Sequence, residues 1–351
     1  MSGASSPFIS IIIPVYNGGL AFQNCLKSLF AHLPKTEEHL AEVIVVADGC
    51  TDGSDLIAEK FGATVLRTEA PRGPARARNI GARKARGEVL FFVDADVTVH
   101  NNTVDKVAQL FQTQSTLAAV IGSYDNEPGA PNFLSQYKNL FHHYTHQTSS
   151  EEASTFWGAC GAMRRAIFWE VGGFDESYEK PSIEDIELGY RLRRKGYSIR
   201  LCKSLFVKHL KRWEPVSLLR AEFFYRALPW TELLLRQEQV NNDLNLNIST
   251  RISVILTFGL IFSTFLGILW TQAWFIAGAF ALALLICNLP VYRFFQRQRG
   301  TWFMLKVIPW HWLYFAYCGL AYGLGNIRYF FKNDKSNSLV LSESDEEKAP
   351  V

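Results

Sequence analysis

The stretch GEVLFFVDADV, residues 87–97, decides the fold. Five apolar residues in a row, Val89–Val93, lead directly to two carboxylates, Asp94 and Asp96, which are separated by one alanine. An unbroken apolar run is typical of a strand that helices cover on both faces, as in parallel sheets. The two acids then lie where the strand emerges, at the edge where such sheets bind ligands. The stretch predicts an α/β sheet with a possible Mg²⁺ or Mn²⁺ site at one edge.

The chain around this stretch alternates between apolar runs and helical patterns. The predicted strands are 8–13 (ended by Pro14), 43–46, 64–66, 89–93 and 118–121, and the predicted helices are 21–33, 55–61, 75–85 and 104–111. This alternation predicts a mostly parallel sheet with helices on both faces, inside one domain of residues 1–212. We expect the loops 14–19, 47–54 and 94–96 to line one edge of the sheet. The chain has no G-x-G-x-x-G and no P-loop motif, so a dinucleotide or P-loop site has little support.

Composition sets further limits. The 351 residues carry a formal net charge of +3, which gives no indication of a nucleic-acid partner. The six cysteines form no C-x-x-C pair and no zinc-like spacing, so we expect reduced thiols in a cytoplasmic setting. The first residues lack a basic region followed by an apolar one, so no secretory signal peptide is predicted.

The apolar residues collect after Arg251. Residues 252–292 contain no charged side chain, and Thr271 and Gln272 divide them into two segments, 252–270 and 273–292. Each segment is about long enough to cross a bilayer core. The flanking arginines predict that both outer ends face the cytoplasm, so the protein is expected to be an integral membrane protein, in a bacterial inner membrane, with a cytoplasmic catalytic domain. The alternative is a buried helical hairpin of a soluble protein.

Three neighbouring segments complete the predicted organisation. Residues 213–250 are predicted to be an interfacial amphipathic segment whose helix, 214–240, is broken at Pro229; the alternative is a helix that packs on the globular domain. Within the predicted membrane region, 251–330, a third apolar segment, 307–327, either spans the membrane or lies in its interface. The polar and acidic tail, 331–351, is predicted to be disordered.

Five motifs in order give the sequence a family resemblance. They are ISIIIPVYNGG, VIVVADGCTDGS, RGPARARNIGARKARGEVLFFVDADV, GACGAMRRAIFWEVGGFDE and SIEDIELGYRLRRKGY. Together they resemble family 2 glycosyltransferases over residues 10–209. The resemblance implies a GT-A fold, a nucleotide-diphosphate sugar as donor, and inversion at the anomeric carbon.

The resemblance also assigns donor-side residues. Pro14 and Tyr16 resemble the first wall of the nucleotide pocket, and Asp48 resembles the acid that contacts the base or ribose. Arg78 belongs to an A-R-N motif near the nucleotide; its alternative is a charge on a solvated basic helix. Asp94 and Asp96 match the metal-binding D-x-D motif, with Asp96 expected to be the direct ligand.

The acceptor side follows later in the chain. Gly158 lies in a run of small residues that lets backbone approach a substrate closely, and Glu184–Asp185 is the critical pair. The resemblance makes Asp185 the general base that removes the acceptor hydroxyl's proton. A second interpretation, compatible with the first, is a capping box between Ser182 and Asp185 at the start of a helix over 185–195.

The segment KHLKRW closes the resemblance. His209, Arg212 and Trp213 have the spacing of the Q-x-x-R-W motif of processive synthases, with histidine in place of glutamine. His209 could be a third metal ligand, could touch the diphosphate, or could be structural. Arg212 and Trp213 could lie on the acceptor side or anchor the chain at a membrane interface.

The expected function is that of a membrane-anchored, non-processive transferase. Its donor would be a UDP-sugar, its metal Mg²⁺ or Mn²⁺, and its acceptor a lipid-linked or amphipathic molecule at the cytoplasmic face of a membrane. The alternatives are a processive polysaccharide synthase and a non-catalytic membrane scaffold that retains a GT-A domain.

Overall fold

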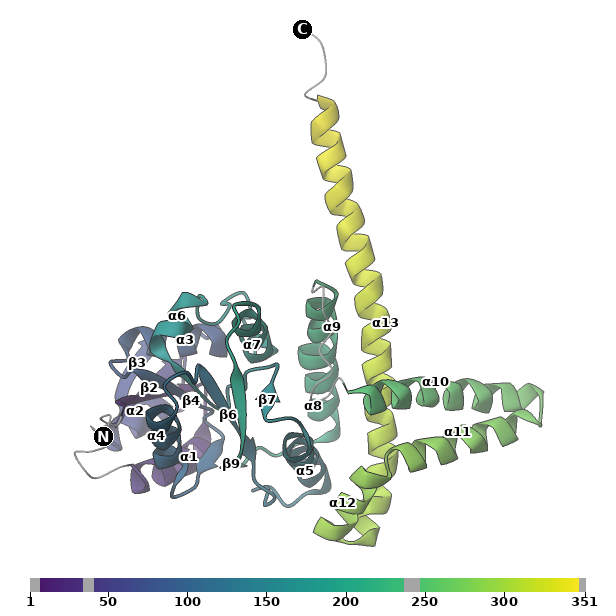
Figure 1. The fold of residues 1–351 in the computed structure, drawn as a ribbon, viewed down its shortest axis with the longest axis horizontal. Coiled ribbons are helices and arrows are strands. Elements are labelled where there is room, and N and C mark those ends of the chain that lie inside the picture. Colours follow the sequence, from purple (N-terminus) through teal and green to yellow (C-terminus); the bar gives the residue numbers. More distant parts are fainter. Residues whose placement is uncertain (1–6, 34–40, 237–246, 347–351) are drawn as a thin grey trace. The chain divides into compact units, whose positions relative to one another are not determined.

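The computed structural model describes residues 7–33, 41–236 and 247–346, with side chains up to residue 331. The chain divides into two compact units, which we describe separately (Figure 1). The first unit holds the described residues up to Leu218 together with Phe294–Phe303, and the second holds the remainder.

The first unit is built on a nine-stranded mixed sheet with the order β3-β2-β1-β4-β8-β6-β9-β5, in which β7 also pairs with β9. The strands are β1 (Ile9–Val15), β2 (Ala41–Asp48), β3 (Thr64–Thr68), β4 (Val89–Val93), β5 (Val97–Val99), β6 (Ala119–Tyr124), β7 (Glu152–Ala153), β8 (Cys160–Arg164) and β9 (Ile199–His209). The helices are α1 (Gly19–Ala31), α2 (Ser54–Lys60), α3 (Pro74–Lys84), α4 (Thr103–Thr113), α5 (Phe133–Thr148), α6 (Arg165–Glu170) and α7 (Glu184–Arg194). Strands β1 to β4 are joined in parallel, as predicted, whereas β8 pairs antiparallel with β4 and with β6.

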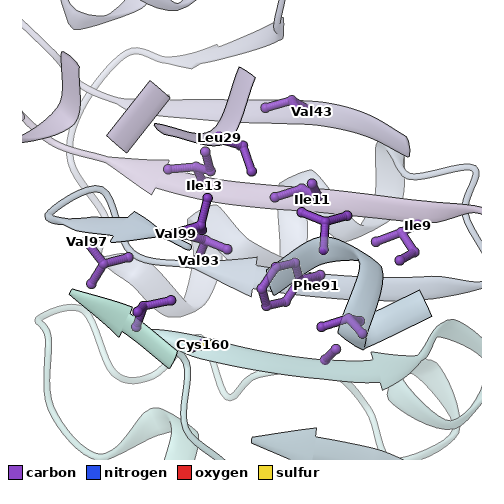
Figure 2. Packing of buried hydrophobic residues seen from close by; sticks show 14 of the residues in the cluster. Ile9, Ile11, Ile13, Leu29, Val43, Phe91, Val93, Val97, Val99 and Cys160 are labelled. Atoms are coloured by element: carbon purple, nitrogen blue, oxygen red, sulfur yellow. The ribbon is translucent and has the colours of Figure 1, made fainter. Parts of the chain in front are cut away.

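Strand β4 lies inside the sheet and is covered on both faces. All five of its residues are fully buried. Phe91 and Val93 pack on one face with Ile11 and Ile13 of β1, as Figure 2 shows. Phe92 packs on the other face among aromatic rings from the later part of the domain, Phe156, Phe168 and Phe174. The unbroken apolar run of the sequence is thereby explained, and the prediction of a doubly covered strand is confirmed.

Pro14 does not end β1, contrary to the prediction. The strand continues to Val15 and stays in register with β2 as far as Ala47. Its register with β4 ends at Ile12. Pro14 therefore lies where β1 has a partner on one side only, a position at which a missing N–H can be tolerated.

Residues 294–303 belong to the first unit, although the sequence places them in the predicted membrane region. Their aromatic rings pack on α5, with centroid distances of 5.1 Å for Phe294–Tyr144, 5.8 Å for Phe295–Tyr137 and 5.0 Å for Phe303–Phe133. Arg299 adds a hydrogen bond of 2.9 Å from Nε to Gln136 Oε1. The segment is aromatic because it packs against an aromatic helix face inside a folded unit.

The segment after Trp213 is helical but is not broken at Pro229. Helix α8 (Pro215–Arg220) passes through a π-helical turn, η1 (Ala221–Ala227), into α9 (Leu228–Leu235). Pro229 lies in the first turn of α9, where a missing N–H does little harm, so the irregularity is the π turn before it. The predicted helix continues to residue 240, but residues 237–246 lie outside the described part.

Within the described residues, one helix is long and apolar enough to cross a membrane by length and composition: α10 (Ile248–Leu269). The second predicted span, 273–292, is different. Helix α11 (Ala273–Cys287) is followed by α12 (Leu289–Arg299) with a bend of 62°, and only the two together pass the same test. Pro290 fits this bend, because proline disfavours the helical conformation at the residue before it.

The rest of the second unit is helical too. Helices α10 and α11 pack closely, and the Asn288 side chain after α11 donates a 2.9 Å hydrogen bond to Ser253 Oγ in α10. The third apolar segment, 307–327, lies inside one long helix, α13 (Thr301–Glu346). Residues 331–346 of the predicted disordered tail are therefore helical, consistent with the absence of glycine and proline between Gly325 and Pro350. Residues 347–351 lie outside the described part.

Candidate active site

The loops at the carboxyl ends of β1 and β2 are joined to each other. Asn17 Oδ1 accepts the backbone N–H of Thr51 at 2.8 Å, and Gly18 N–H donates to Ser54 Oγ at 3.1 Å. Asp52 Oδ2 accepts the N–H of Gly19 at 3.1 Å. The prediction that these loops share one edge of the sheet is confirmed for this pair.

Arg78 joins the two sides of the candidate site. It lies on α3 and is buried, with Nη2 2.7 Å from Asp94 Oδ1 and Nη1 2.8 Å from Glu184 Oε1. A Cβ atom at position 158 would lie 2.9 Å from Nη2, so Gly158 makes room for the guanidinium. The guanidinium also lies over the Phe174 ring, with Cζ 5.3 Å from the ring centroid. The interpretation of Arg78 as a solvated surface charge is therefore wrong.

The two neighbouring acids keep the Arg78 guanidinium protonated. Burial by itself lowers the pKa of the guanidinium, but the Asp94 and Glu184 carboxylates outweigh it and raise that pKa above its ordinary value. The group therefore remains a cation inside the protein. Glu184 is also buried and accepts the N–H of Ser182 at 2.9 Å. These bonds direct the carboxylate of Glu184 inward, toward Arg78.

The two acids of the D-x-D motif have different partners. Asp94 pairs with Arg78, and burial still raises the pKa of Asp94 above its ordinary value. Burial also opposes ionisation of Asp96, but His209 and Lys211 outweigh this and lower the pKa of Asp96. Both carboxylates keep about a third of their side-chain surface exposed, at 32% and 34%. Asp96 is thus the acid that carries its charge most readily toward a bound cation.

His209 lies beside Asp96 because of strand pairing. Val97, directly after Asp96, pairs with His209 at the end of β9, and Leu210 N–H donates to the Asp96 carbonyl at 2.8 Å. The His209 Nε2 atom is 3.5 Å from Asp96 Oδ2, and its Nδ1 atom is 2.7 Å from Asn139 Oδ1. Tyr124 stacks on the ring, with centroids 4.5 Å apart and planes 9° from parallel.

The donor set fits a divalent cation. In the part of the chain that the structure describes, no group of three or more His, Cys, Asp or Glu side chains gathers into a ready metal centre. Asp94, Asp96 and His209 nevertheless supply two carboxylates and one imidazole nitrogen at one edge of the sheet. Such a partial set suits Mg²⁺ or Mn²⁺ in sites where phosphate oxygens and water complete the coordination.

Asp185 lies in the first turn of α7 and is half-buried. Its Oδ2 atom accepts the N–H of Gly158 at 3.0 Å, and its Oδ1 atom accepts the N–H of Ile186 at 2.8 Å. Helix α7 begins at Glu184, one residue before the predicted start, and its N-cap is Ile183. The carboxylate is oriented by backbone from two different segments.

The remaining donor-side residues differ in exposure. Asp48 is buried, and its carboxylate accepts hydrogen bonds from Thr68 Oγ1 at 2.8 Å and from the N–H groups of Arg72 and Gly73, both at 2.9 Å. These bonds attach β2 to the loop before α3. Tyr16 is 58% exposed just after β1, and Pro14 is partly buried within that strand. Of these residues, Tyr16 offers the most open surface to a ligand.

Arg212 and Trp213 have separate environments. Arg212 is exposed and its Nε donates to Glu214 at 2.8 Å. Trp213 is buried, and its backbone N–H donates to Ser135 Oγ on α5 at 2.7 Å. The interpretation of Trp213 as an aromatic anchor at a membrane interface is therefore wrong, because its ring packs inside the first unit.

Three residues next to the site were not predicted: Tyr124, Asn139 and Trp157. Tyr124 contacts Trp157 edge-on at 4.8 Å, in addition to stacking on His209. Asn139 lies on the same face of α5 as His142 and His146, at positions i, i+3 and i+7. Apolar residues at that spacing mark the buried face of a helix, but these three are polar, so no local pattern pointed to them.

Comparisons with known proteins agree with this architecture. Residues 10–172 match the family model Glycosyl transferase family 2, so this part of the chain is similar to that family. Glycosyltransferase GlyG of Streptococcus pneumoniae is 34% identical over 126 residues, which cover 34% of this chain and 40% of GlyG. Validoxylamine A glucosyltransferase of Streptomyces hygroscopicus subsp. jinggangensis is 28% identical over 236 residues, covering 56% of this chain and 54% of that protein. The chain thus spans about half, or less, of the length of these relatives.

A solved structure supports the fold. The mannosyltransferase PcManGT from Pyrobaculum calidifontis, in complex with GDP-Man and Mn²⁺, superposes with a TM-score of 0.58 at 17% sequence identity. The match covers 90% of this chain and 87% of that one. The first unit therefore has a mixed α/β, GT-A-like fold.

Proposed function

We propose that the protein transfers a sugar, with inversion, from a nucleotide-diphosphate donor to an acceptor hydroxyl. The observation that carries this proposal is the chain of contacts from Asp94 through Arg78 to Glu184, the residue before Asp185. It joins the D-x-D carboxylates to the start of α7, where a base for the acceptor would lie. The match to the family 2 model and the glycosyltransferase relatives support the same reaction class.

The donor would bind at the edge formed by the β1, β2 and β4 loops. The exposed ring of Tyr16 is suited to stack against a nucleotide base. Mg²⁺ or Mn²⁺ would be held by Asp96 with Asp94 and His209, and when bound it would neutralise charge on the diphosphate as the sugar leaves. The Mn²⁺ and GDP-Man bound to PcManGT support a metal and a nucleotide sugar as ligands. UDP is our choice of nucleotide on the family resemblance alone.

Asp185 is proposed as the general base. Two backbone N–H groups hold its carboxylate in one orientation, and the residue is only partly buried, so an acceptor could reach it. A base fixed in this way can take the proton of a hydroxyl as that oxygen attacks the anomeric carbon. A single displacement of this kind inverts the configuration.

The acceptor is proposed to be lipid-linked or amphipathic. Helix α10 is apolar enough to cross a membrane, and the arginines that flank the apolar segments favour a cytoplasmic site. A processive polysaccharide synthase is the weaker candidate, because the first position of Q-x-x-R-W is His209, and that ring contacts Asn139 and Asp96.

The decisive experiment uses the full chain in detergent. Release of nucleoside diphosphate is measured across a panel of nucleotide sugars with Mn²⁺ or Mg²⁺, and with soluble or lipid-linked acceptors. We expect one donor to be consumed only with a divalent cation and faster with the lipid-linked acceptor. Equal rates with soluble sugars would overturn the acceptor class, and a full rate in EDTA would overturn metal dependence.

A further inference from the structure

Asn139 is a buried amide that, among the described residues, has a hydrogen-bond contact on one side only of its polar group. It lies on α5, is 1% exposed, and places Oδ1 2.7 Å from His209 Nδ1. Its Nδ2 atom is buried and has no hydrogen-bond partner in the described part of the chain. An amide that leaves its donor unpaired costs free energy, so a leucine would be the expected residue here if packing alone mattered.

The contact determines which nitrogen of His209 carries a proton. An amide oxygen can only accept, so Nδ1 must carry the hydrogen. When the ring is neutral, its lone pair therefore lies at Nε2; when the ring is protonated, the Nε2–H group instead faces Asp96 Oδ2, 3.5 Å away. Stacking on Tyr124 and pairing of the strand with Val97 keep the ring in this position.

We propose that Asn139 is a positioning residue that fixes the His209 tautomer so that Nε2 faces the cation held by Asp96. This inference rests on the metal-dependent function proposed above. It has a consequence for metal choice, because Mg²⁺ demands oxygen ligands in a strict octahedral geometry, and an imidazole nitrogen replaces one of those oxygens. The Asn139–His209 pair therefore biases the site toward Mn²⁺ over Mg²⁺.

The test measures metal binding directly in the full chain in detergent with UDP present. Free Mn²⁺ is followed by electron paramagnetic resonance, and Mg²⁺ affinity is obtained by competition. Removing a hydrogen-bond partner of a ligating histidine typically weakens metal binding about 10- to 100-fold. We expect that loss for Mn²⁺ in both Asn139→Leu and Asn139→Ala, with a smaller change for Mg²⁺. Asn139→Asp keeps an acceptor toward Nδ1 and should retain Mn²⁺ binding.

Ser135→Ala is the matched control. Ser135 lies one turn earlier on α5 and is fully buried. Its Oγ accepts the backbone N–H of Trp213, and the alanine variant loses this hydrogen bond. We expect a lower melting temperature for this variant but an unchanged preference for Mn²⁺. The Asn139→Leu and Asn139→Ala side chains differ in size. If one variant does not fold, the Mn²⁺ affinity of the other still tests the proposal.

The outcomes separate the two proposals. If the wild-type chain with UDP binds no Mn²⁺, the metal-dependent function itself is wrong. If the wild-type chain binds Mn²⁺ and Asn139→Leu or Asn139→Ala keeps the same affinity and the same Mn²⁺ preference, the positioning role of Asn139 alone is wrong.

Discussion

Arg78 donates a hydrogen bond from Nη2 to Asp94 Oδ1 over 2.7 Å inside the first unit. Because its other terminal nitrogen binds Glu184, one guanidinium pairs with an acid on each side of the site, and the two acids share its single positive charge. The two acids of the D-x-D motif therefore face different protein groups: Asp94 faces Arg78, and Asp96 faces His209. Arg78 thus fixes the positions of the Asp94 and Glu184 carboxylates by hydrogen bonds to both.

Replacement of Arg78 by methionine should destabilise the first unit strongly. The change leaves two acids without their cation, and breaking a buried ion pair by removing one partner typically costs about 3 to 5 kcal/mol. Urea denaturation of the full chain, followed by tryptophan fluorescence, measures this loss.

Arg83→Met on the same helix is the control for that experiment. Arg83 is 55% exposed and pairs with Glu176 at the surface, so its loss should cost less than about 1 kcal/mol. Equal stability of the Arg78 and Arg83 variants would show that the buried pairing of Arg78 with Asp94 and Glu184 does not stabilise the first unit.

The part of the fold that depends on local pattern was predictable. Val89–Val93 was predicted residue for residue, because an apolar run bounded by Gly87 and Asp94 admits one interpretation. Strands β8 and β9 were not predicted, because their pairing joins residues far apart in sequence, such as Phe91 with Ala162 in β8 and Ile121 with Leu201 in β9. Non-local pairing leaves no local periodicity to read.

The site shows the same limit. Asp94, Asp96 and Asp185 could be named from motifs, and the structure gives each a buried or half-buried setting at the sheet edge. Asn139 carries no motif, and its importance appears only when α5 is packed against the end of β9. Arg78 was named, but its partner Glu184 is 106 residues away, so the sequence could not show that it faces inward.

Asp185→Asn tests the proposed base. The amide keeps the shape of the side chain but cannot take a proton, so transfer should fall by about 10²- to 10⁴-fold while UDP affinity stays the same. Initial rates and calorimetric UDP titration measure the two quantities.

Asp175→Asn is the matched control for the base. Asp175 is an exposed acid in the loop before α7 whose carboxylate accepts the Ser177 N–H, so we expect a near-normal rate. An Asp185→Asn enzyme that transfers sugar normally would exclude Asp185 as base, and normal biological function of an inactive variant would favour the scaffold alternative.

Protonation of Glu42 should contribute to the loss of folded-state stability at acid pH. Burial opposes ionisation of Glu42, but hydrogen bonds from Ser10 and Arg86 outweigh it and lower the pKa of the carboxyl below its usual 4.5. Because the folded-state pKa is the lower one, the stabilisation is present above about pH 4.5 and is lost as the pH falls through the folded value. Glu42→Gln should therefore be less stable than wild type at pH 7, with a gap that narrows toward pH 3.

Urea denaturation at several pH values measures this gap. Glu59→Gln, at an exposed carboxylate paired with Arg67, serves as a control and should change stability little at any pH. A gap for Glu42→Gln that stays constant from pH 7 to pH 3 would show that packing, rather than ionisation, explains the loss.

Phe295→Ala should destabilise the α/β unit although the residue is distant in sequence from the sheet. Phe295 is fully buried and its ring lies 5.8 Å from Tyr137 on α5, so its loss leaves a cavity that typically costs about 3 to 5 kcal/mol. Arg297→Ala, two residues away and exposed, should cost little.

A chain cut after Leu218 should be less soluble than one to which residues 294–303 are rejoined by a linker, because α5 would expose Phe133, Tyr137 and Tyr144. Thermal melts of the point variants and sedimentation of the cut chains check both effects, and a soluble, fully stable cut chain would show that α5 does not need this segment.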